Sequence, residues 1–323
     1  MQELLSIYYG IEVNESIVIA DKIGWRNKEY TYFTISGMNK EEIFMEQASA
    51  AVFLHYNGYP QIALPIQNNF GEWLTRWNDQ YYMVLFTWDK PLLPDEHHGV
   101  KLANFHKKSQ HYPYQPMVIS NFKQWKDLWI ERLTNLEKQI IEVTQKQSEE
   151  KYRYMLNIMP YIIGICENAI QYIREAEQEE YYAATDKAAI TFIRYQHQLT
   201  QEIIWLDEFV YDYPIRDVTE YIRNLFLSLE DSAVEEAWNF LRGYESVLPF
   251  SKLSWRLLIG RLLFPIHIMD QVTDCLSYGQ EELFDLLKQR IENQSDYEQK
   301  LKRLFQIIGQ NNETLLLPVV KWI

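Results

Sequence analysis

Cysteine and long apolar runs are both scarce in this chain of 323 residues. Cys166 and Cys275 are its two cysteines, which is too few for a disulfide framework, so we expect a reducing compartment. The most apolar window, Leu257 to Met269, is interrupted by Arg261 and is too short to cross a bilayer. Met1 to Ile11 lacks the basic start, apolar run and cleavage site of a secretory signal. We therefore expect a soluble protein, made in the cytoplasm and not inserted into a membrane.

Basic residues are also outnumbered. The chain has 31 lysines and arginines against 45 aspartates and glutamates, a formal net charge of −14. Such a charge repels phosphate backbones and anionic lipid heads, so nucleic acid is not an expected partner. Aromatic residues are plentiful, with 23 tyrosines and 10 tryptophans. Most aromatics fill cores, but some of these could form contact surfaces.

The length and the apolar content favour a globular protein of two lobes. The chain is longer than one compact unit usually is, and 47% of its residues are hydrophobic. Residues 1–88 have the β-branched and aromatic content of strands, expected at 16–20, 29–35, 62–65, 72–77 and 81–86. One helix is expected between them, from about Asn39 to Leu54, ended by Asn57-Gly58. The sequence thus predicts a small N-terminal lobe with an antiparallel sheet and one helix.

Helical periodicity dominates the rest of the chain. Residues 89–98 hold prolines and charges and are interpreted as an interlobe linker. Apolar residues at spacings of three and four then predict helices at 100–106, 122–145, 152–177, 218–229, 233–244, 253–278, 280–291 and 297–308. Short strands are expected only near 190–193 and 203–206. The expected fold class is therefore α+β, with a larger, mostly helical C-terminal lobe at 99–323.

One segment resembles a known family. Residues 211–217 read Tyr-Asp-Tyr-Pro-Ile-Arg-Asp, and a second specific stretch runs from Trp255 to Pro265. Together with the two-lobed pattern, these residues resemble the protein-kinase-like fold of choline kinases and aminoglycoside phosphotransferases. Within that fold the chain is most similar to the spore coat kinase-like proteins of the CotS family, YutH branch. The resemblance implies synthesis in the mother cell during sporulation, a place in the spore coat and other coat proteins as partners.

The same resemblance shows where catalysis would need its residues. Phosphoryl transfer requires a carboxylate that holds Mg²⁺ against the nucleotide phosphates and a base or orienting carboxylate. Trp205 occupies the position at which the metal-holding aspartate is expected, and residues 190–199, where related kinases have a His-x-Asp loop, contain neither aspartate nor asparagine. We therefore expect no catalytic residue, no metal and no cofactor. If the protein is active after all, ATP and Mg²⁺ are the expected cofactors, with His197, Asp207 and Asp212 as catalytic residues and Asp207 and Asp212 as metal ligands.

Other features of a nucleotide site are missing as well. The expected central strand, residues 30–35, has no lysine, and Gly24 stands alone rather than in a glycine-rich loop. Lys22 or Lys28 could supply a substitute lysine, and Glu42 or Glu46 on the following helix would lack the usual ion-pair partner. Four histidines, at 97, 98, 106 and 111, match no metal-binding spacing.

Arg216 and Asp217 are expected to be structural. Asp217 precedes Val218-Thr219-Glu220, a helix start signal in which the aspartate accepts free backbone N–H groups. Arg216 is expected to bridge to a neighbouring acid.

Three functions stay open from the sequence. The favoured one is a catalytically inactive pseudokinase that acts as a structural or scaffolding coat component. The alternatives are an active small-molecule phosphotransferase with a displaced Mg²⁺ site, and a cleft that binds a ligand without catalysis.

Overall fold

The computed structural model describes residues 1–37, 40–88, 96–147, 149–179, 182–228 and 230–311. Contacts divide the chain into two compact units. The sheet unit comprises Met1–His97, Lys101–Asn121 and Ala188–Pro214, and the helical unit comprises His98–Val100, Phe122–Lys187 and Ile215–Ile323. This grouping differs from the expected division at residues 1–88 and 99–323, because residues 101–121 and 188–214 pack with the sheet. Residues 89–95 of the expected linker lie outside the described part of the chain.

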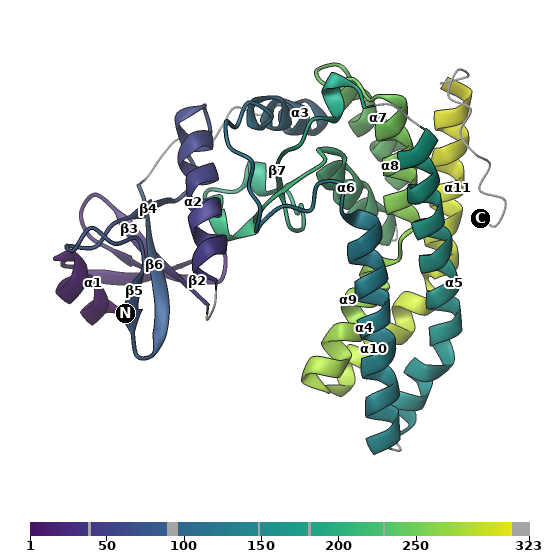
Figure 1. Ribbon diagram of the computed structural model, residues 1–323, viewed down its shortest axis with the longest axis horizontal. Coiled ribbons are helices and arrows are strands. Elements are labelled where there is room, and N and C mark those ends of the chain that lie inside the picture. The colour runs from purple at the N-terminus through teal and green to yellow at the C-terminus, as the bar shows by residue number, and fades with distance from the viewer. Residues whose placement is uncertain (38–39, 89–95, 148, 180–181, 229, 312–323) are drawn as a thin grey trace. The chain divides into compact units, whose positions relative to one another are not determined.

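An antiparallel sheet in the order β1-β2-β3-β6-β4, with β5 paired to β6, organises the sheet unit (Figure 1). Its strands are β1 (Glu15–Ile19), β2 (Lys22–Arg26), β3 (Thr31–Ser36), β4 (Leu64–Ile66), β5 (Thr75–Trp77) and β6 (Gln80–Thr87). The expected turn after Trp77 is confirmed, since Asn78 and Asp79 both have positive φ and Trp77 pairs with Gln80. That geometry is the two-residue turn that matches strand twist.

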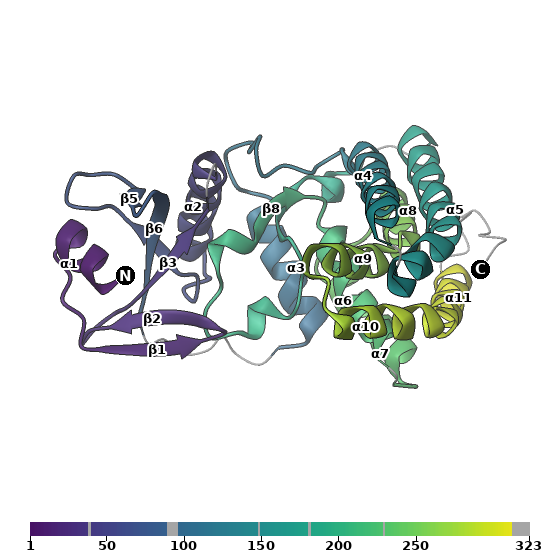
Figure 2. The same ribbon diagram turned by 90° about the horizontal axis from the view of Figure 1, so that it is seen from below.

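Two helices of the sheet unit lie at its N-terminal end and after β3. Helix α2 (Glu41–Tyr56) agrees with the expected helix, although its expected first residue, Asn39, lies outside the described residues. Helix α1 (Gln2–Tyr9) was not predicted. Its Leu4, Leu5 and Tyr9 form a buried cluster with Tyr32 of β3 and Val84 of β6. The N-terminal segment is therefore part of the core of the sheet unit (Figure 2).

A second, two-stranded sheet joins β7 (Ala189–Phe192) and β8 (Phe209–Asp212), with Ala189 opposite Asp212 and Phe192 opposite Phe209. The expected strand at 203–206 is wrong. Those residues are buried, but they form one isolated bridge, between Ile204 and Ile62, followed by a 3-10 turn at Leu206–Glu208. The apolar run reflects burial on all sides rather than a strand ladder.

The remaining helices are α3 (His98–Ser109), α4 (Trp125–Lys146), α5 (Glu150–Glu179), α6 (Ile215–Leu227), α7 (Ala233–Glu245), α8 (Lys252–Leu263), α9 (Ile266–Tyr278), α10 (Glu281–Glu292) and α11 (Gln294–Asn311). The helix expected over 253–278 is broken into α8 and α9, because Pro265 has no N–H to continue the ladder. Helix α8 is buried from Leu253 to Leu263. A Cβ on Gly260 would lie 2.5 Å from Ile173 of α5, so only glycine permits this close approach of α5 and α8.

The observed architecture confirms the α+β class, with a small antiparallel sheet and a larger helical portion. Cys166 and Cys275 are both buried and unpaired, as expected for a chain without a disulfide framework. In the described part of the chain, no helix combines the length and the apolar content needed to span a membrane.

Candidate functional site

The hairpin of β1 and β2 contains the isolated Gly24 that the sequence analysis compares with a glycine-rich loop. Here a two-residue turn closes it, formed by Ala20 and Asp21 with φ of 47° and 61°. Gly24 is the glycine of this hairpin, and it lies opposite Phe33 of β3. A Cβ at Gly24 would come within 2.6 Å of the Phe33 ring. Gly24 is thus required for packing and does not form a phosphate-binding loop.

Trp205 fills the position expected for a metal-holding aspartate. Its side chain is 1% exposed and meets the Phe33 ring edge to face, with the ring centres 4.8 Å apart. The indole Nε1 is buried and has no hydrogen-bond partner among the described residues. A packed aromatic pair therefore lies at the position where the sequence analysis expects a metal-holding carboxylate.

Lys22 is the lysine that reaches this place. Its ammonium lies 4.7 Å from the centre of the Trp205 ring and donates to both carboxylate oxygens of Asp207, at 2.9 and 2.8 Å. Of the two substitutes considered from the sequence, the structure thus brings Lys22 to the site. The Asp207 carboxylate, which was the alternative metal ligand, is held in an ion pair.

Glu46 of α2 has no lysine partner in the described structure. Its carboxylate accepts three backbone N–H groups, from Met117, Val118 and Ile119, at 2.8 to 2.9 Å. The next residue, Gln47, donates to the carbonyl oxygens of Asp207 and Phe209. This helix therefore holds two neighbouring loops through its polar side chains, a role that the sequence analysis missed.

His197 follows β7 and has a left-handed backbone conformation, with φ of 62°. Burial lowers the pKa of its imidazole, so the ring is neutral at pH 7. Burial is also the main cause that raises the pKa of Glu208, whose carboxylate accepts a hydrogen bond of 2.8 Å from Gln198. Asp212 is fully buried at the end of β8, and its Oδ1 accepts the backbone N–H of Tyr213.

Arg216 and Asp217 are both buried in the first turn of α6. The expectation that Asp217 caps a helix starting at Val218 is wrong, since α6 begins at Ile215. The rigid Tyr213-Pro214 pair precedes this start, and proline is well suited to the entrance of a helix. The negative charge of Asp217 adds to the burial that raises the pKa of Tyr244, which indicates a buried polar contact inside the helical unit.

Three of the four histidines lie in different surroundings. His98 stacks on Tyr221, His106 is fully buried, and His111 contacts the Lys107 carbonyl. Within the described residues there is no group of three histidine, cysteine or acidic side chains placed to hold a metal ion.

The residues present do not fit Mg²⁺ and a nucleotide. The metal position is an indole, and the nearby carboxylate is paired with Lys22. A cavity beside the strands encloses about 10 Å³ and is lined by Ile19, Arg26, Thr31, Gln61, Thr87, Trp88, Glu202 and Ile203. Pockets that hold small ligands measure about 300–1,000 Å³, so this cavity is too small for a purine ring.

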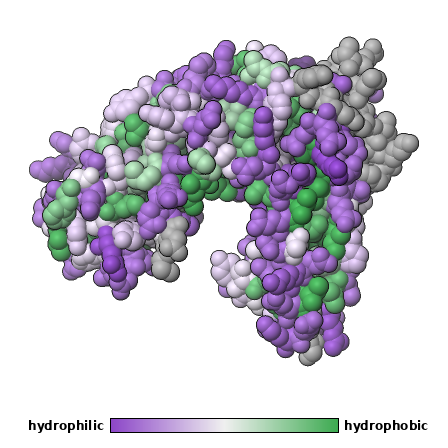
Figure 3. Space-filling model, in the orientation of Figure 1, coloured by the Kyte–Doolittle hydropathy of each residue, from purple (hydrophilic) through white to green (hydrophobic). Residues whose placement is uncertain are grey.

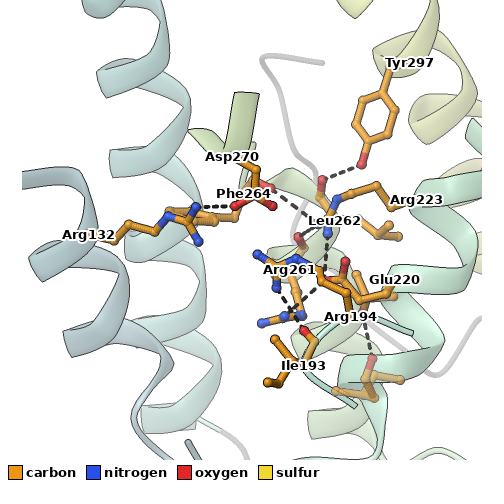
Figure 4. Close-up of polar contacts among 12 residues, drawn as sticks. Arg132, Ile193, Arg194, Glu220, Arg223, Arg261, Leu262, Phe264, Asp270 and Tyr297 are labelled. Atoms are coloured by element: carbon orange, nitrogen blue, oxygen red, sulfur yellow. Dashed lines mark hydrogen bonds and ion pairs between the residues drawn. The ribbon is translucent and has the colours of Figure 1, made fainter. Parts of the chain in front are cut away.

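A buried ion cluster lies in the helical unit (Figure 4). Glu220 of α6 accepts from Arg223 and Arg261, at 3.1 and 3.0 Å, and all three side chains are at most 5% exposed. Arg223 also donates to the carbonyls of Arg261 and Phe264, and the Tyr297 hydroxyl donates to that of Leu262. The cluster ties α6, α8 and α11 together and is structural. Arg261 belongs to the specific stretch from Trp255 to Pro265, but no sequence pattern pairs it with Glu220 and Arg223.

Comparison with known proteins identifies the family. Residues 2–304 match the model of the family described as "Spore coat putative kinase YutH". The chain is 32% identical over 242 residues to the endospore coat-associated protein YutH of Bacillus subtilis (strain 168), covering 70% of this chain and 68% of that protein.

Solved structures show the fold. An aminoglycoside phosphotransferase from Alicyclobacillus acidocaldarius superposes with a TM-score of 0.64 at 11% identity, covering 96% of this chain and 97% of that one. A spectinomycin phosphotransferase in its AMP-bound complex gives a TM-score of 0.59 at 15% identity, with coverages of 93% and 96%. The fold is therefore kinase-like, and the chain belongs to the YutH family of spore coat kinase-like proteins.

Proposed function

We propose that this YutH-family protein is a coat-associated pseudokinase that transfers no phosphate and binds no Mg²⁺-nucleotide. The observation that supports the proposal best is the side-chain arrangement around Trp205. A buried indole stands where a metal-holding carboxylate is required, and Lys22 bridges the ring and Asp207. Phosphoryl transfer depends almost entirely on positioned charges, so a site without them has no route to catalysis.

The protein then acts through its surface, as a structural or scaffolding component. It is made in the mother cell and joins the spore coat by docking onto other coat proteins. The relative from Bacillus subtilis, named as endospore coat-associated, supports the location. The kinase-like fold serves in this proposal as a rigid scaffold, in which Trp205 and Phe33 replace the nucleotide site by packed side chains.

Nucleotide binding provides the first test. Thermal unfolding of the purified protein is measured with ATP or ADP at millimolar concentration, with and without Mg²⁺. An active aminoglycoside phosphotransferase serves as the positive control. We expect no change in Tm for this protein and no ATP hydrolysis. A Mg²⁺-dependent rise in Tm that disappears in Asp207→Asn would instead support a phosphotransferase with a displaced metal site.

Localisation provides the second test. A fluorescent fusion produced during sporulation is expected to form a shell around the forespore. The variant with both Asp207→Asn and Asp212→Asn should form the same shell if its folded state is kept. Diffuse fluorescence in the mother cell throughout coat assembly would contradict the coat role.

A further inference from the structure

An open groove runs between α4 and α5 in the helical unit. It encloses about 860 Å³, and its apolar side chains are Ile130 and Leu133 of α4 and Ile163 and Ile170 of α5. Figure 3 shows apolar side chains gathered in a strip along this pair of helices, with polar ones on both sides. Neither Trp205 nor any candidate catalytic residue lines the groove.

Packing within the helical unit explains only part of the apolar strip, since Leu133 is buried, whereas Ile163 and Ile170 are half-buried. Helix α4 buries Trp125, Trp129, Leu133, Leu136 and Ile140, which accounts for its inward face. Ile130, in contrast, is 46% exposed. The exposed Ile130 and the half-buried Ile163 and Ile170, with polar side chains on both sides, give the groove a mixed lining that an amphipathic partner could match.

The charged side chains on the rim of the groove indicate which charge a partner's contacting side chains would carry. Four carboxylates line the groove, from Asp127, Glu137, Glu167 and Glu177, against two cations, Lys126 and Arg174. The rim therefore has a net negative charge. A second copy of this chain fits poorly, because two molecules of charge −14 would meet through acidic surfaces.

Glu177 adds an independent observation. Its Oε1 atom is buried and has no hydrogen-bond partner among the described residues. Burial is also the main cause that raises the pKa of its carboxyl group. A cation delivered by a partner would satisfy this oxygen and favour the ionised carboxylate.

We propose that the α4–α5 groove binds an amphipathic helix of another protein, with an apolar stripe flanked by lysines or arginines. Two antiparallel helices with an apolar floor receive a third helix by groove packing. The lining residues on α5 extend from Ile163 to Gln178, about 22 Å along the helix axis at 1.5 Å per residue. A partner helix of about 15 residues matches this length. That the partner is a coat protein rests on the proposed function, whereas the groove and its charge preference do not.

The probe is a labelled synthetic 15-residue peptide with leucines on one helical face and lysines on the other. Its twin carries glutamate in place of each lysine, and a third peptide scrambles the lysine sequence. Fluorescence anisotropy measures their binding to the full-length protein at two salt concentrations, without nucleotide. We expect the lysine peptide to bind at least about tenfold more tightly than its twin and than the scrambled peptide.

Variants locate the binding site. Ile130→Gln, and separately the pair Glu137→Lys and Glu167→Lys, should each weaken binding of the lysine peptide by about tenfold. The charge reversals should also reduce its salt dependence. Ile141→Gln and Glu131→Lys change the same residue types on α4 outside the groove lining, and they should leave affinity within about twofold. Circular dichroism and Tm measurements check that each variant is folded. If Ile130→Gln does not fold, the charge-reversal pair alone tests whether the peptide binds in the groove.

Three results would overturn the proposal. They are equal binding of the lysine and glutamate peptides, binding that the groove variants do not alter, and absence of binding by the lysine peptide. Sedimentation equilibrium tests whether a second copy of this chain occupies the groove instead. A dimer that dissociates in the Ile130→Gln variant would assign the groove to that second copy. These outcomes involve no nucleotide and no coat, so they are distinguishable from failure of the proposed function.

Discussion

The ammonium group of Lys22 donates hydrogen bonds to both carboxylate oxygens of Asp207, 185 positions away in the chain. The two side chains are 27% and 30% exposed, so the ion pair is only partly screened by water. It connects the β1–β2 hairpin to the segment that follows Trp205. In this protein Lys22 and Asp207 thus form a structural link between the hairpin and that segment.

The first prediction concerns this ion pair. A double-mutant cycle with Lys22→Met and Asp207→Asn should give a coupling free energy of about 0.5–1 kcal/mol in urea unfolding. The pair Arg76–Asp79 is the control. Its side chains are 66% and 93% exposed, and we expect its coupling to be near zero. Equal coupling for the two pairs would contradict the structural role of Lys22.

The second prediction concerns Gly24. Gly24→Ala should lower the free energy of unfolding by about 1–3 kcal/mol, because the new methyl group overlaps the Phe33 ring. Adding Phe33→Leu should recover part of the loss. Gly164→Ala on α5 is the matched control, since a Cβ there meets no atom within 4 Å, and it should stabilise the helix by about 0.5–1 kcal/mol. No loss in Gly24→Ala would show that the hairpin packs differently.

The third prediction concerns the buried ion cluster. Glu220→Gln removes the carboxylate that faces two buried guanidinium groups, so we expect the free energy of unfolding to fall by about 3–5 kcal/mol. Asp285→Asn removes one partner of an exposed pair with Lys288 and should cost less than about 1 kcal/mol. Chemical denaturation of both variants checks the difference. Similar small losses would mean that Glu220 is not the charge that compensates these arginines.

The fourth prediction is a pH dependence. Burial, with the charge of Arg223 as a further cause, lowers the pKa of His267 to about 3, whereas an unfolded histidine has a pKa of about 6.5. The folded state excludes a proton that the unfolded state binds, so stability is lost as the pH falls below about 6.5. Because of this one histidine, the free energy of unfolding falls by up to about 1.4 kcal/mol for each unit of pH.

Urea unfolding between pH 7 and pH 4.5 checks this dependence. His267→Gln should remove the contribution of this histidine to the pH dependence of the free energy of unfolding, whatever the variant's stability at pH 7. His111→Gln, an exposed histidine, should leave the slope unchanged. A slope that is the same in wild type and His267→Gln would contradict the assignment.

Local patterns predicted much of this fold. Strand alternation and the Asn78-Asp79 turn located the sheet, and apolar spacing located most helices. The sequence-based predictions were wrong where contacts between distant parts of the chain determine the local structure. The run at 203–206 is apolar because it is enclosed, Pro265 ends a helix inside a continuous apolar pattern, and α1 is stabilised by contacts with Tyr32 and Val84. None of these causes is a property of neighbouring residues alone.

The contacts made by the candidate site residues could not be predicted from the sequence. The missing strand lysine and the tryptophan at position 205 are visible in the sequence. The partners of Lys22 and Glu46 are not, since they lie 185 and more than 70 positions away. The capping role expected for Asp217 was wrong because α6 begins two residues earlier, at Ile215, so that Asp217 lies within its first turn.

Both cysteines report on the folded state. Burial raises the pKa of Cys166 to about 12 and that of Cys275 to about 11, and only the thiolate attacks a disulfide or an alkylating reagent efficiently. Oxidants and alkylating reagents should therefore leave these two thiols untouched until the chain unfolds. Alkylation of the two cysteines would count the molecules that have lost their structure, which makes the thiols a built-in reporter of unfolding.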